Sequence, residues 1–319
     1  MSGGPWPSWR LCAKSSPGMT RKQRAGGQGR RVAAPVGGLD SPIGVFDSGI
    51  GGLTVLRALT QAMPREQFLY LGDTARVPYG SKSAEVVTSY ALEVADFFLE
   101  RGVKMLVVAC NSTSALALDA LRAHATVPVI GVVEAGARAA ARATRNGRVG
   151  VIGTEATIAS GAYPRALRSL DREVEIFTRP CPLFVPLAEE GWVANEVARR
   201  TVALYLASLR RSGIDALVLG CTHYPLLSDA IGSYLGEAVQ LVDGGIETAR
   251  EVRKTLGSAG LLNKRGPGGA SFFVTDVPER FVRVGERFYG ESVGSAVRVV
   301  LRETGTAGKP TLRAARTSG

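Results

Sequence analysis

Two cysteines lie in near-identical sequence contexts, and cysteine can act as an acid, a base or a nucleophile. The segment "RGVKMLVVACNS" (101–112) aligns without gaps on "SGIDALVLGCTH" (212–223), so that Cys110 pairs with Cys221. Each cysteine follows an apolar run and precedes a predicted helix, whose N-terminal dipole lowers a cysteine pKa from its usual ~8.5. A single cysteine in such a place would be interpreted as a small buried residue. The duplication instead predicts two thiols that act as bases or nucleophiles.

Two ionisable residues accompany these thiols. His223, one of only two histidines, lies two residues after Cys221 and could relay a proton at neutral pH or simply bond a backbone carbonyl. Asp47 ends the apolar run "IGVFD" and is interpreted either as an acid of the site or as a helix cap. Cys221 and His223 supply two of the about four ligands that a structural zinc site needs, so no metal site is predicted.

Three further segments carry polar residues. The glycine-rich turn in "FDSGIGGLTVLRAL" (46–59) can hold an anion on its amides, but it lacks the P-loop and dinucleotide signatures, so a carboxylate ligand suits it as well. "DTARVPYGSKS" (73–83) places Tyr79 on a loop near the same sheet edge. Glu189 and Glu190 are adjacent, and adjacent acids are most often solvated surface charge. A catalytic function for this pair therefore stays open.

Composition limits the class of protein. With 319 residues, 45% of them hydrophobic and 21% charged, the chain is predicted to be globular and to form two domains. No apolar run approaches the ~18 residues that span a bilayer, so no membrane association is predicted. Four cysteines without a CxxC pair fit the reducing cytoplasm better than a disulfide-bonded scaffold.

The net charge of +11 is concentrated at the two ends of the chain. Residues 1–40 contain seven Arg and Lys against one acid, and residues 306–319 contain three basic residues and no acid. The part between is nearly neutral, so no nucleic-acid-binding groove is predicted. Residues 1–40 lack a hydrophobic period and a secretory signal, which indicates a flexible basic extension or a start codon placed too far upstream. Residues 302–319 are predicted to be a flexible basic tail.

Short apolar runs alternate with helical patterns along the rest of the chain. The helical patterns at 83–102 and 195–213 end at Gly102 and Gly213, the residue type that commonly terminates a helix. This alternation predicts an α/β fold with mostly parallel sheets flanked by helices. The predicted strands lie at 43–47, 68–73, 105–110, 127–132, 148–153, 175–181, 216–221, 239–243 and 271–275.

The internal repeat predicts two pseudo-symmetric α/β domains. Besides the cysteine segments, "IGVFDSG" (43–49) resembles "VGVIGTE" (149–155). We expect the first domain at 41–135 plus 245–301 and the second at 136–244. In open α/β sheets ligands bind beyond the carboxyl ends of the strands, where Asp47, Cys110 and Cys221 all fall. The active site is therefore predicted in the cleft between the domains.

Four ordered motifs, "FDSGIGGL", "VPYGSKS", "VACNS" and "LGCTHYPLL", resemble those of the glutamate racemases in the aspartate/glutamate racemase superfamily. The resemblance runs from about Pro42 to about residue 300. It implies a cofactor-independent isomerase that interconverts L- and D-glutamate with two opposed cysteines and supplies D-glutamate for peptidoglycan and the cell wall. Inverting a stereocentre without a cofactor requires an acid and a base on opposite faces of the substrate, which pseudo-symmetric halves can provide.

The resemblance also implies roles for individual residues. Cys110 would act on D-glutamate with help from Asp47, and Cys221 on L-glutamate with help from His223. Glu189, or its neighbour Glu190, would be a further acid near the second thiol. Substrate-binding positions would be Asp47, Ser48, Tyr79, Gly80, Asn111, Ser112, Thr222 and His223. A homodimer is the assembly that the resemblance suggests.

The sequence departs from the family pattern at two positions, and two other functions remain as alternatives. Ser112 stands where threonine is frequent, and Ala135 where proline is expected. One alternative is a racemase of aspartate or another amino acid. The other is a binding protein that keeps the cleft without turnover and contacts nucleic acid or gyrase through its basic N-terminal extension.

Overall fold

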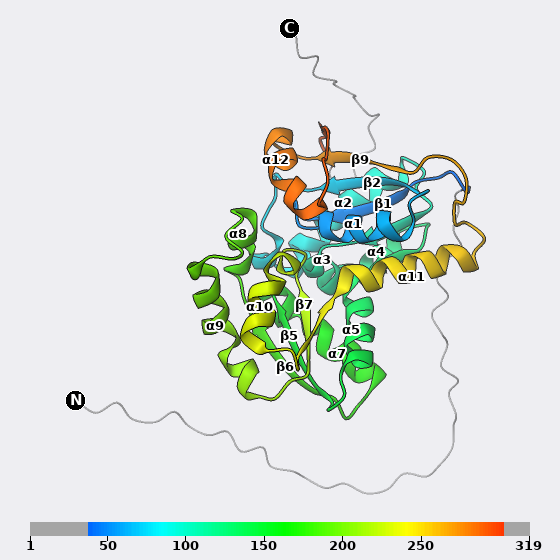
Figure 1. Ribbon diagram of the computed structural model, residues 1–319. Helices are drawn as coiled ribbons and strands as arrows, with labels where there is room; N and C mark the ends of the chain where they lie inside the picture. The colour runs from blue at the N-terminus through cyan, green and yellow to red at the C-terminus, as the bar shows by residue number, and fades with distance from the viewer. Residues whose placement is uncertain (1–37, 303–319) are drawn as a thin grey trace, which may run out of the picture. The chain divides into compact units, whose positions relative to one another are not determined.

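The computed structural model describes residues 38–302, which form two fully parallel sheets surrounded by helices (Figure 1). Sheet A has the strand order β10-β9-β2-β1-β3-β4, and sheet B has the order β6-β5-β7-β8. Sheet A comprises β1 (Ile43–Asp47), β2 (Gln67–Gly72), β3 (Met105–Val108), β4 (Val129–Gly131), β9 (Gly269–Val274) and β10 (Ala296–Arg298). Sheet B comprises β5 (Arg148–Gly153), β6 (Glu175–Pro180), β7 (Ala216–Gly220) and β8 (Gln240–Asp243). The predicted α/β class and all nine predicted strands are confirmed.

The strand order reproduces the internal repeat. The run β2-β1-β3-β4 in sheet A corresponds to β6-β5-β7-β8 in sheet B. Val45 pairs with Val107 between β1 and β3, and Val151 pairs with Val218 between β5 and β7. Cys110 and Cys221 therefore follow equivalent strands of two equivalent sheets. The domain limits at 135/136 and 244/245 stay predictions.

The helices begin and end where local sequence signals place them. Ser83 and Asn195 accept a hydrogen bond from the third residue beyond them and so cap α2 and α9. Gly102 and Gly213 follow these two helices with φ of +65° and +66°, a conformation that disfavours a β carbon. The helices are α1 (Leu53–Ala62), η1 (Tyr79–Ser81), α2 (Ala84–Leu99), α3 (Asn111–Leu116), α4 (Leu118–His124), α5 (Val132–Ala143), α6 (Glu155–Ala159), α7 (Ala162–Leu170), α8 (Phe184–Glu189), α9 (Glu196–Arg211), η2 (Tyr224–Leu227), α10 (Ser228–Leu235), α11 (Gly244–Ser258) and α12 (Pro278–Tyr289).

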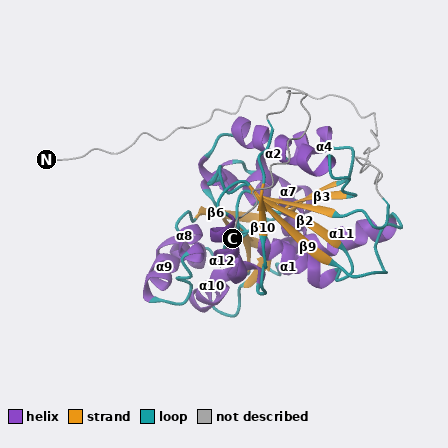
Figure 2. Ribbon diagram, turned by 90° about the horizontal axis from the view of Figure 1, so that it is seen from above, coloured by secondary structure: helices purple, strands orange, loops and turns teal. Residues whose placement is uncertain are grey.

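The central strands of each sheet, β1, β3, β5 and β7, are buried on both faces, as strands inside parallel sheets are. In sheet A, Ile43 and Val45 pack into one apolar cluster with residues of α1 and α11, and Phe46 packs into a second cluster with residues of α2. Figure 2 shows α1 and α11 on one side of the strands of sheet A and α2 and α4 on the other. In sheet B, Val151 faces the cluster of α5 and α7, and Ile152 faces that of α9. Burial on both faces explains why these strands are continuous apolar runs.

The chain returns to sheet A after completing sheet B. Helix α11 leads back from β8, and β9 then pairs with β2 before α12 and β10 complete the sheet. Strand β10 was not predicted, because three residues of which two are exposed carry no periodic signal. No helix within residues 38–302 is long and apolar enough to cross a membrane. The extension before residue 38 and the tail after residue 302 lie outside the described residues.

Candidate active site

Cys110 lies at the junction between β3 and α3, as predicted. It is the N-cap residue of α3, it is 6% exposed, and its Sγ donates to Ser48 Oγ at 3.4 Å. The expected lowering of its pKa is wrong for this structure. Burial raises the pKa of the Cys110 thiol, the charge of Asp47 raises it further, and hydrogen bonds with Ser48 and Thr113 offset only part of this. Burial of the thiolate outweighs the dipole of a helix of only six residues.

Asp47 is the buried acid beside this thiol. Its Oδ2 accepts from the amide of Gly49 at 2.9 Å, whereas its Oδ1 has no hydrogen-bond partner within the described part of the chain. Burial raises the pKa of Asp47, the charge of His223 and hydrogen bonds from the amides of Gly49 and Gly52 oppose this, and the charge of Glu189 adds to it. The N-cap residue of α1 is Gly52, which has no side chain to cap the helix. An acid with a raised pKa and a free oxygen is available for chemistry.

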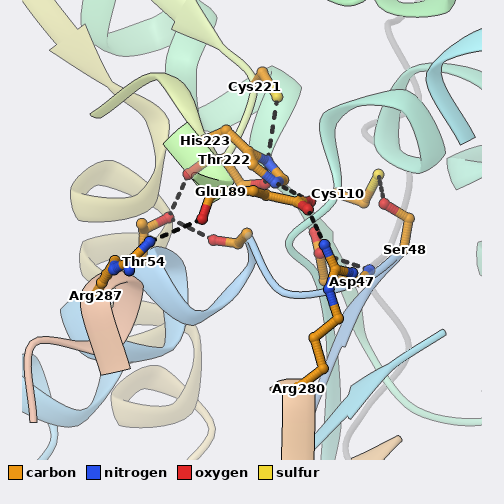
Figure 3. Close-up of polar contacts among 12 residues, drawn as sticks. Asp47, Ser48, Thr54, Cys110, Glu189, Cys221, Thr222, His223, Arg280 and Arg287 are labelled. Atoms are coloured by element: carbon orange, nitrogen blue, oxygen red, sulfur yellow. Dashed lines mark hydrogen bonds and ion pairs between the residues drawn. The ribbon is translucent and has the colours of Figure 1, made fainter. Parts of the chain in front are cut away.

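Cys221 begins a chain of polar contacts (Figure 3). Its Sγ lies 3.8 Å from His223 Nδ1, and His223 Nε2 lies 3.2 Å from Glu189 Oε1. The helix expected directly after Cys221 is the 3₁₀ turn η2, of which His223 is the N-cap. Glu190 is exposed at the C-terminus of α8, so it is Glu189 that contacts the histidine.

The contacts of His223 decide its charge. Burial, the largest influence, would lower its pKa, but hydrogen bonds to Cys221 and Glu189 and the charges of Cys221 and Asp47 raise the pKa to about 10. In turn, the hydrogen bond from His223 is the main cause that lowers the pKa of Glu189. His223 is therefore an imidazolium at neutral pH, which is the charge needed to stabilise a neighbouring thiolate.

Residues on α3 make side-chain hydrogen bonds to α6 and α7, the helices that follow β5 of sheet B in the sequence. Asn111 Oδ1 accepts from the hydroxyl of Tyr163 at 2.7 Å. Ser112 Oγ lies 2.9 Å from Thr154 Oγ1 and 3.2 Å from Thr157 Oγ1. Ser112 thus uses its hydroxyl in these contacts. Neutral donors and acceptors from both halves meet beside Cys110.

The turn after β1 meets the segment that follows β7. Thr54 Oγ1 donates to the main-chain oxygen of Thr222 at 3.0 Å. A β carbon on Gly51 would lie 2.3 Å from Thr222 Oγ1 and 2.4 Å from His223 Nδ1. Only a glycine fits at Gly51 without displacing these two groups.

Tyr79 and Gly80 occupy the edge of this arrangement. The hydroxyl of Tyr79 donates to Asp73, and its ring is fully buried against Phe46. A β carbon on Gly80 would lie 2.7 Å from the Cβ of Thr154, so η1 touches the start of α6 there. The structure brings Gly80 to the contact between the halves and directs the Tyr79 hydroxyl to Asp73.

Several residues near the thiols were missed in the sequence. Thr154 was detectable, because it aligns with Ser48 when "VGVIGTE" is placed on "IGVFDSG". Arg280 and Arg287, which contact Glu189, carry no local signal. Within residues 38–302, no group of three or more His, Cys, Asp or Glu is arranged to hold a metal ion.

Known proteins are similar to this chain over most of its length. The family model for Asp/Glu/Hydantoin racemase matches residues 43–252. A glutamate racemase from Geobacter metallireducens is 56% identical over 260 residues, which cover 81% of this chain and 96% of the relative. The chain belongs to the Asp/Glu/hydantoin racemase family. The resemblance predicted from the four motifs is therefore confirmed.

Solved structures of glutamate racemases share the fold of this family member. The enzyme from Thermus thermophilus, in complex with β-chloro-D-alanine, is 49% identical with a TM-score of 0.76, and the match covers 83% of this chain and 99% of that chain. The enzyme from Francisella tularensis, in complex with D-glutamate, is 36% identical with a TM-score of 0.78, and the match covers 82% of this chain and 98% of that chain. The similarity thus extends over nearly the whole length of both racemases.

Proposed function

We propose that this chain is a glutamate racemase, an isomerase that interconverts L- and D-glutamate with Cys110 and Cys221 as its two proton-transfer groups. The observation that carries the proposal is the pair of buried thiols at equivalent strand ends, each with its own ionisable partner, in a member of this racemase family. The high identity to a glutamate racemase favours glutamate over aspartate as the substrate.

The reaction needs one proton removed and one delivered. With L-glutamate, the Cys221 thiolate takes the α-proton and the Cys110 thiol gives its proton to the opposite face, so that the charge passes from one sulfur to the other. With D-glutamate the same steps run in reverse. His223 would exchange protons with Cys221, and Asp47 with Cys110. After each turnover, the sulfur that began as a thiolate is a thiol, and the sulfur that began as a thiol is a thiolate.

We call Cys221, His223 and Glu189 the Cys221 arm, and Cys110 and Asp47 the Cys110 arm. The two arms differ in charge, which supports distinct acid and base roles. The Cys221 arm contains an imidazolium held by Glu189, whereas the Cys110 arm contains a carboxyl whose pKa is raised by burial. Neighbouring groups whose environments push their pKa values apart are typical of acid and base pairs. Burial and the charge of Asp47 therefore favour the thiol form of Cys110.

The proposed substrate-binding residues suit an amino acid. The unpartnered Oδ1 of Asp47 can accept a hydrogen bond from the substrate ammonium group. The hydroxyls and amides of Ser48, Asn111, Ser112 and Thr222 can donate to its carboxylates. Such donors also stabilise the enolate-like charge that develops when the α-proton leaves. Tyr79 would act through Asp73 and the position of Gly80, since its hydroxyl is already bonded.

The cellular setting is part of the same proposal. We infer that the enzyme works in the cytoplasm, supplies D-glutamate for peptidoglycan, forms a homodimer and divides into domains at 41–135 plus 245–301 and 136–244. Light scattering on the purified chain would test the homodimer, for which a monomer mass is the contrary result.

The test of the activity is proton exchange at the α-carbon. The purified chain is incubated with L-glutamate in deuterium oxide without added cofactor, and loss of circular dichroism and α-deuteration are followed. Racemisation with incorporation of deuterium is expected. Racemisation of aspartate in place of glutamate would support the other racemase, and no reaction with either would favour the binding protein.

A substitution at Gly51 tests the contact between the two halves. Gly51→Ala is expected to lower kcat/KM by about 100-fold, because the new methyl group must displace His223 or Thr222 and shifts of ~1 Å cost that much. Gly257→Ala on α11 is the control, because its β carbon meets no atom within 4 Å. Equal activity of the two variants would contradict the described position of His223.

A further inference from the structure

Helix α12 holds Glu189 with two arginines (Figure 3). Arg280 Nη2 lies 2.9 Å from Glu189 Oε2, and Arg287 Nη1 donates to the main-chain oxygen of Glu189 at 2.9 Å. Along the chain, α12 connects β9 to β10 of sheet A. Helix α8, which ends at Glu189, lies in the connection from β6 to β7 of sheet B. The two halves are therefore joined at the acid that contacts His223.

The two oxygens of Glu189 bind two different cations. Oε1 faces His223 Nε2 and Oε2 faces Arg280, so the guanidinium competes with the imidazolium for one negative charge. The ring of Phe288, also on α12, packs edge-on against the His223 ring with centroids 5.1 Å apart. One helix thus contacts both members of the His223–Glu189 pair.

We propose that Arg280 is a positioning residue that, through Glu189, sets the charge around His223 and thereby which of the two thiols carries the negative charge between turnovers. The inference rests on the proposed function. Arg280 itself contacts neither thiol in the described contacts; it acts through the sequence Arg280, Glu189, His223, Cys221. It would tune only one of the two proton-transfer arms.

The charges that face His223 determine the sign of the effect. Glu189 at the end of α8, Asp47 at the end of β1 and Cys221 after β7 favour the imidazolium, and Arg280 on α12 neutralises part of the Glu189 charge. Without the Arg280 charge, the negative charge of the Glu189 carboxylate is no longer partly neutralised and acts more strongly on His223. The imidazolium is then more stable, so His223 must lose its proton at a higher pH.

The sequence makes a direct measurement possible. The chain has only two histidines, and the second, His124, lies on α4 and pairs with Asp96. The tag-free chain is labelled with ¹⁵N-histidine, and both imidazole signals are titrated by NMR. Arg280→Gln is expected to move the His223 midpoint upward by about 0.3 to 0.7 pH units, a modest shift because Arg280 is half-exposed. The His124 midpoint should not move.

Three variants separate this effect from a general loss of charge. Arg283→Gln removes the same charge from the same helix at an exposed residue that makes no ion pair within residues 38–302, and it should leave His223 unchanged. Arg280→Lys should restore most of the wild-type midpoint. In a Glu189→Gln background, Arg280→Gln should have no further effect, since the coupling passes through the carboxylate.

Kinetics provide the second readout. Because enantiomers have equal free energies, kcat/KM must be equal in the two directions for every variant, and only kcat and KM can diverge. Arg280→Gln is expected to change the ratio of the two kcat values by about two- to threefold. Arg283→Gln should leave that ratio unchanged.

The outcomes are distinct. An upward shift of His223 in Arg280→Gln alone, with a changed kcat ratio, supports the inference. An unchanged His223 midpoint, or an equal shift in Arg283→Gln, overturns it even if the wild type racemises glutamate. Absence of racemisation in the wild type would refute the proposed function instead, and the NMR titration would still report whether the electrostatic coupling exists.

Discussion

Replacing either cysteine with alanine should reduce glutamate racemisation by about 10²- to 10⁴-fold, the usual size of a lost acid or base. Cys110→Ala and Cys221→Ala each remove the group that serves one face of the substrate. Chiral analysis of the product from each enantiomer measures the loss. The effect is expected to be the largest of any single substitution in the site, because no other group beside the α-carbon can replace the missing thiol.

Proton exchange shows which thiol serves which enantiomer. In deuterium oxide, Cys110→Ala should still exchange the α-proton of L-glutamate through Cys221 without inverting it, and Cys221→Ala should do so only with D-glutamate. Cys181→Ala is the matched control, because Cys181 is also buried and, within residues 38–302, the hydrogen bond of its thiol goes to the main-chain oxygen of Arg179 and not to an ionisable side chain. Near-normal racemisation by Cys110→Ala or Cys221→Ala would rule out the two-thiol mechanism.

Lys104→Met should lower the free energy of unfolding by about 3 to 5 kcal/mol, because it leaves a buried carboxylate without its cation. Lys104 and Glu66 are 0% and 1% exposed, and their Nζ and Oε2 atoms lie 2.7 Å apart. The amine also donates to the main-chain oxygens of Leu39 and Leu261, and Glu66 accepts from the amide of Asn263. The pair therefore ties the start of β3 to the segment between α11 and β9.

Urea and thermal unfolding would measure this effect, with a fall in Tm of roughly 10 °C expected. Lys254→Met, at an exposed lysine of α11, is the control and should change stability by less than about 0.5 kcal/mol. Adding Glu66→Leu to Lys104→Met should recover part of the loss, because no unpaired charge then remains. A single variant as stable as the wild type would mean that this pair contributes nothing.

The same pair should have little influence on the reaction. Lys104 precedes β3, whereas Cys110 follows it, so the two lie at opposite ends of the strand. The folded fraction of Lys104→Met is therefore expected to keep its kcat. The Lys104–Glu66 pair and the proposed site thus lie at opposite edges of sheet A, as expected where ligands bind at the carboxyl ends of parallel strands.

The sequence by itself determined the architecture and the two thiols. Strands buried on both faces must be continuous apolar runs, so β1, β3, β5 and β7 were visible as local patterns, and the repeat placed Cys110 and Cys221 at equivalent ends. The same alignment contained Thr154 opposite Ser48. These features are local or repeated, and local periodicity is what a single sequence displays.

Only the tertiary structure decided how the site is charged. The choice of Glu189 over Glu190, the raised pKa of Cys110 and the contact of Arg280 with Glu189 depend on burial and on residues 34 to 91 positions apart in the chain. A pKa follows from the groups that surround a side chain in space, and neither the desolvation of a thiol nor a partner on another helix leaves a trace in the neighbouring residues. The sequence therefore indicates the two thiols, and the fold determines which charged groups surround them.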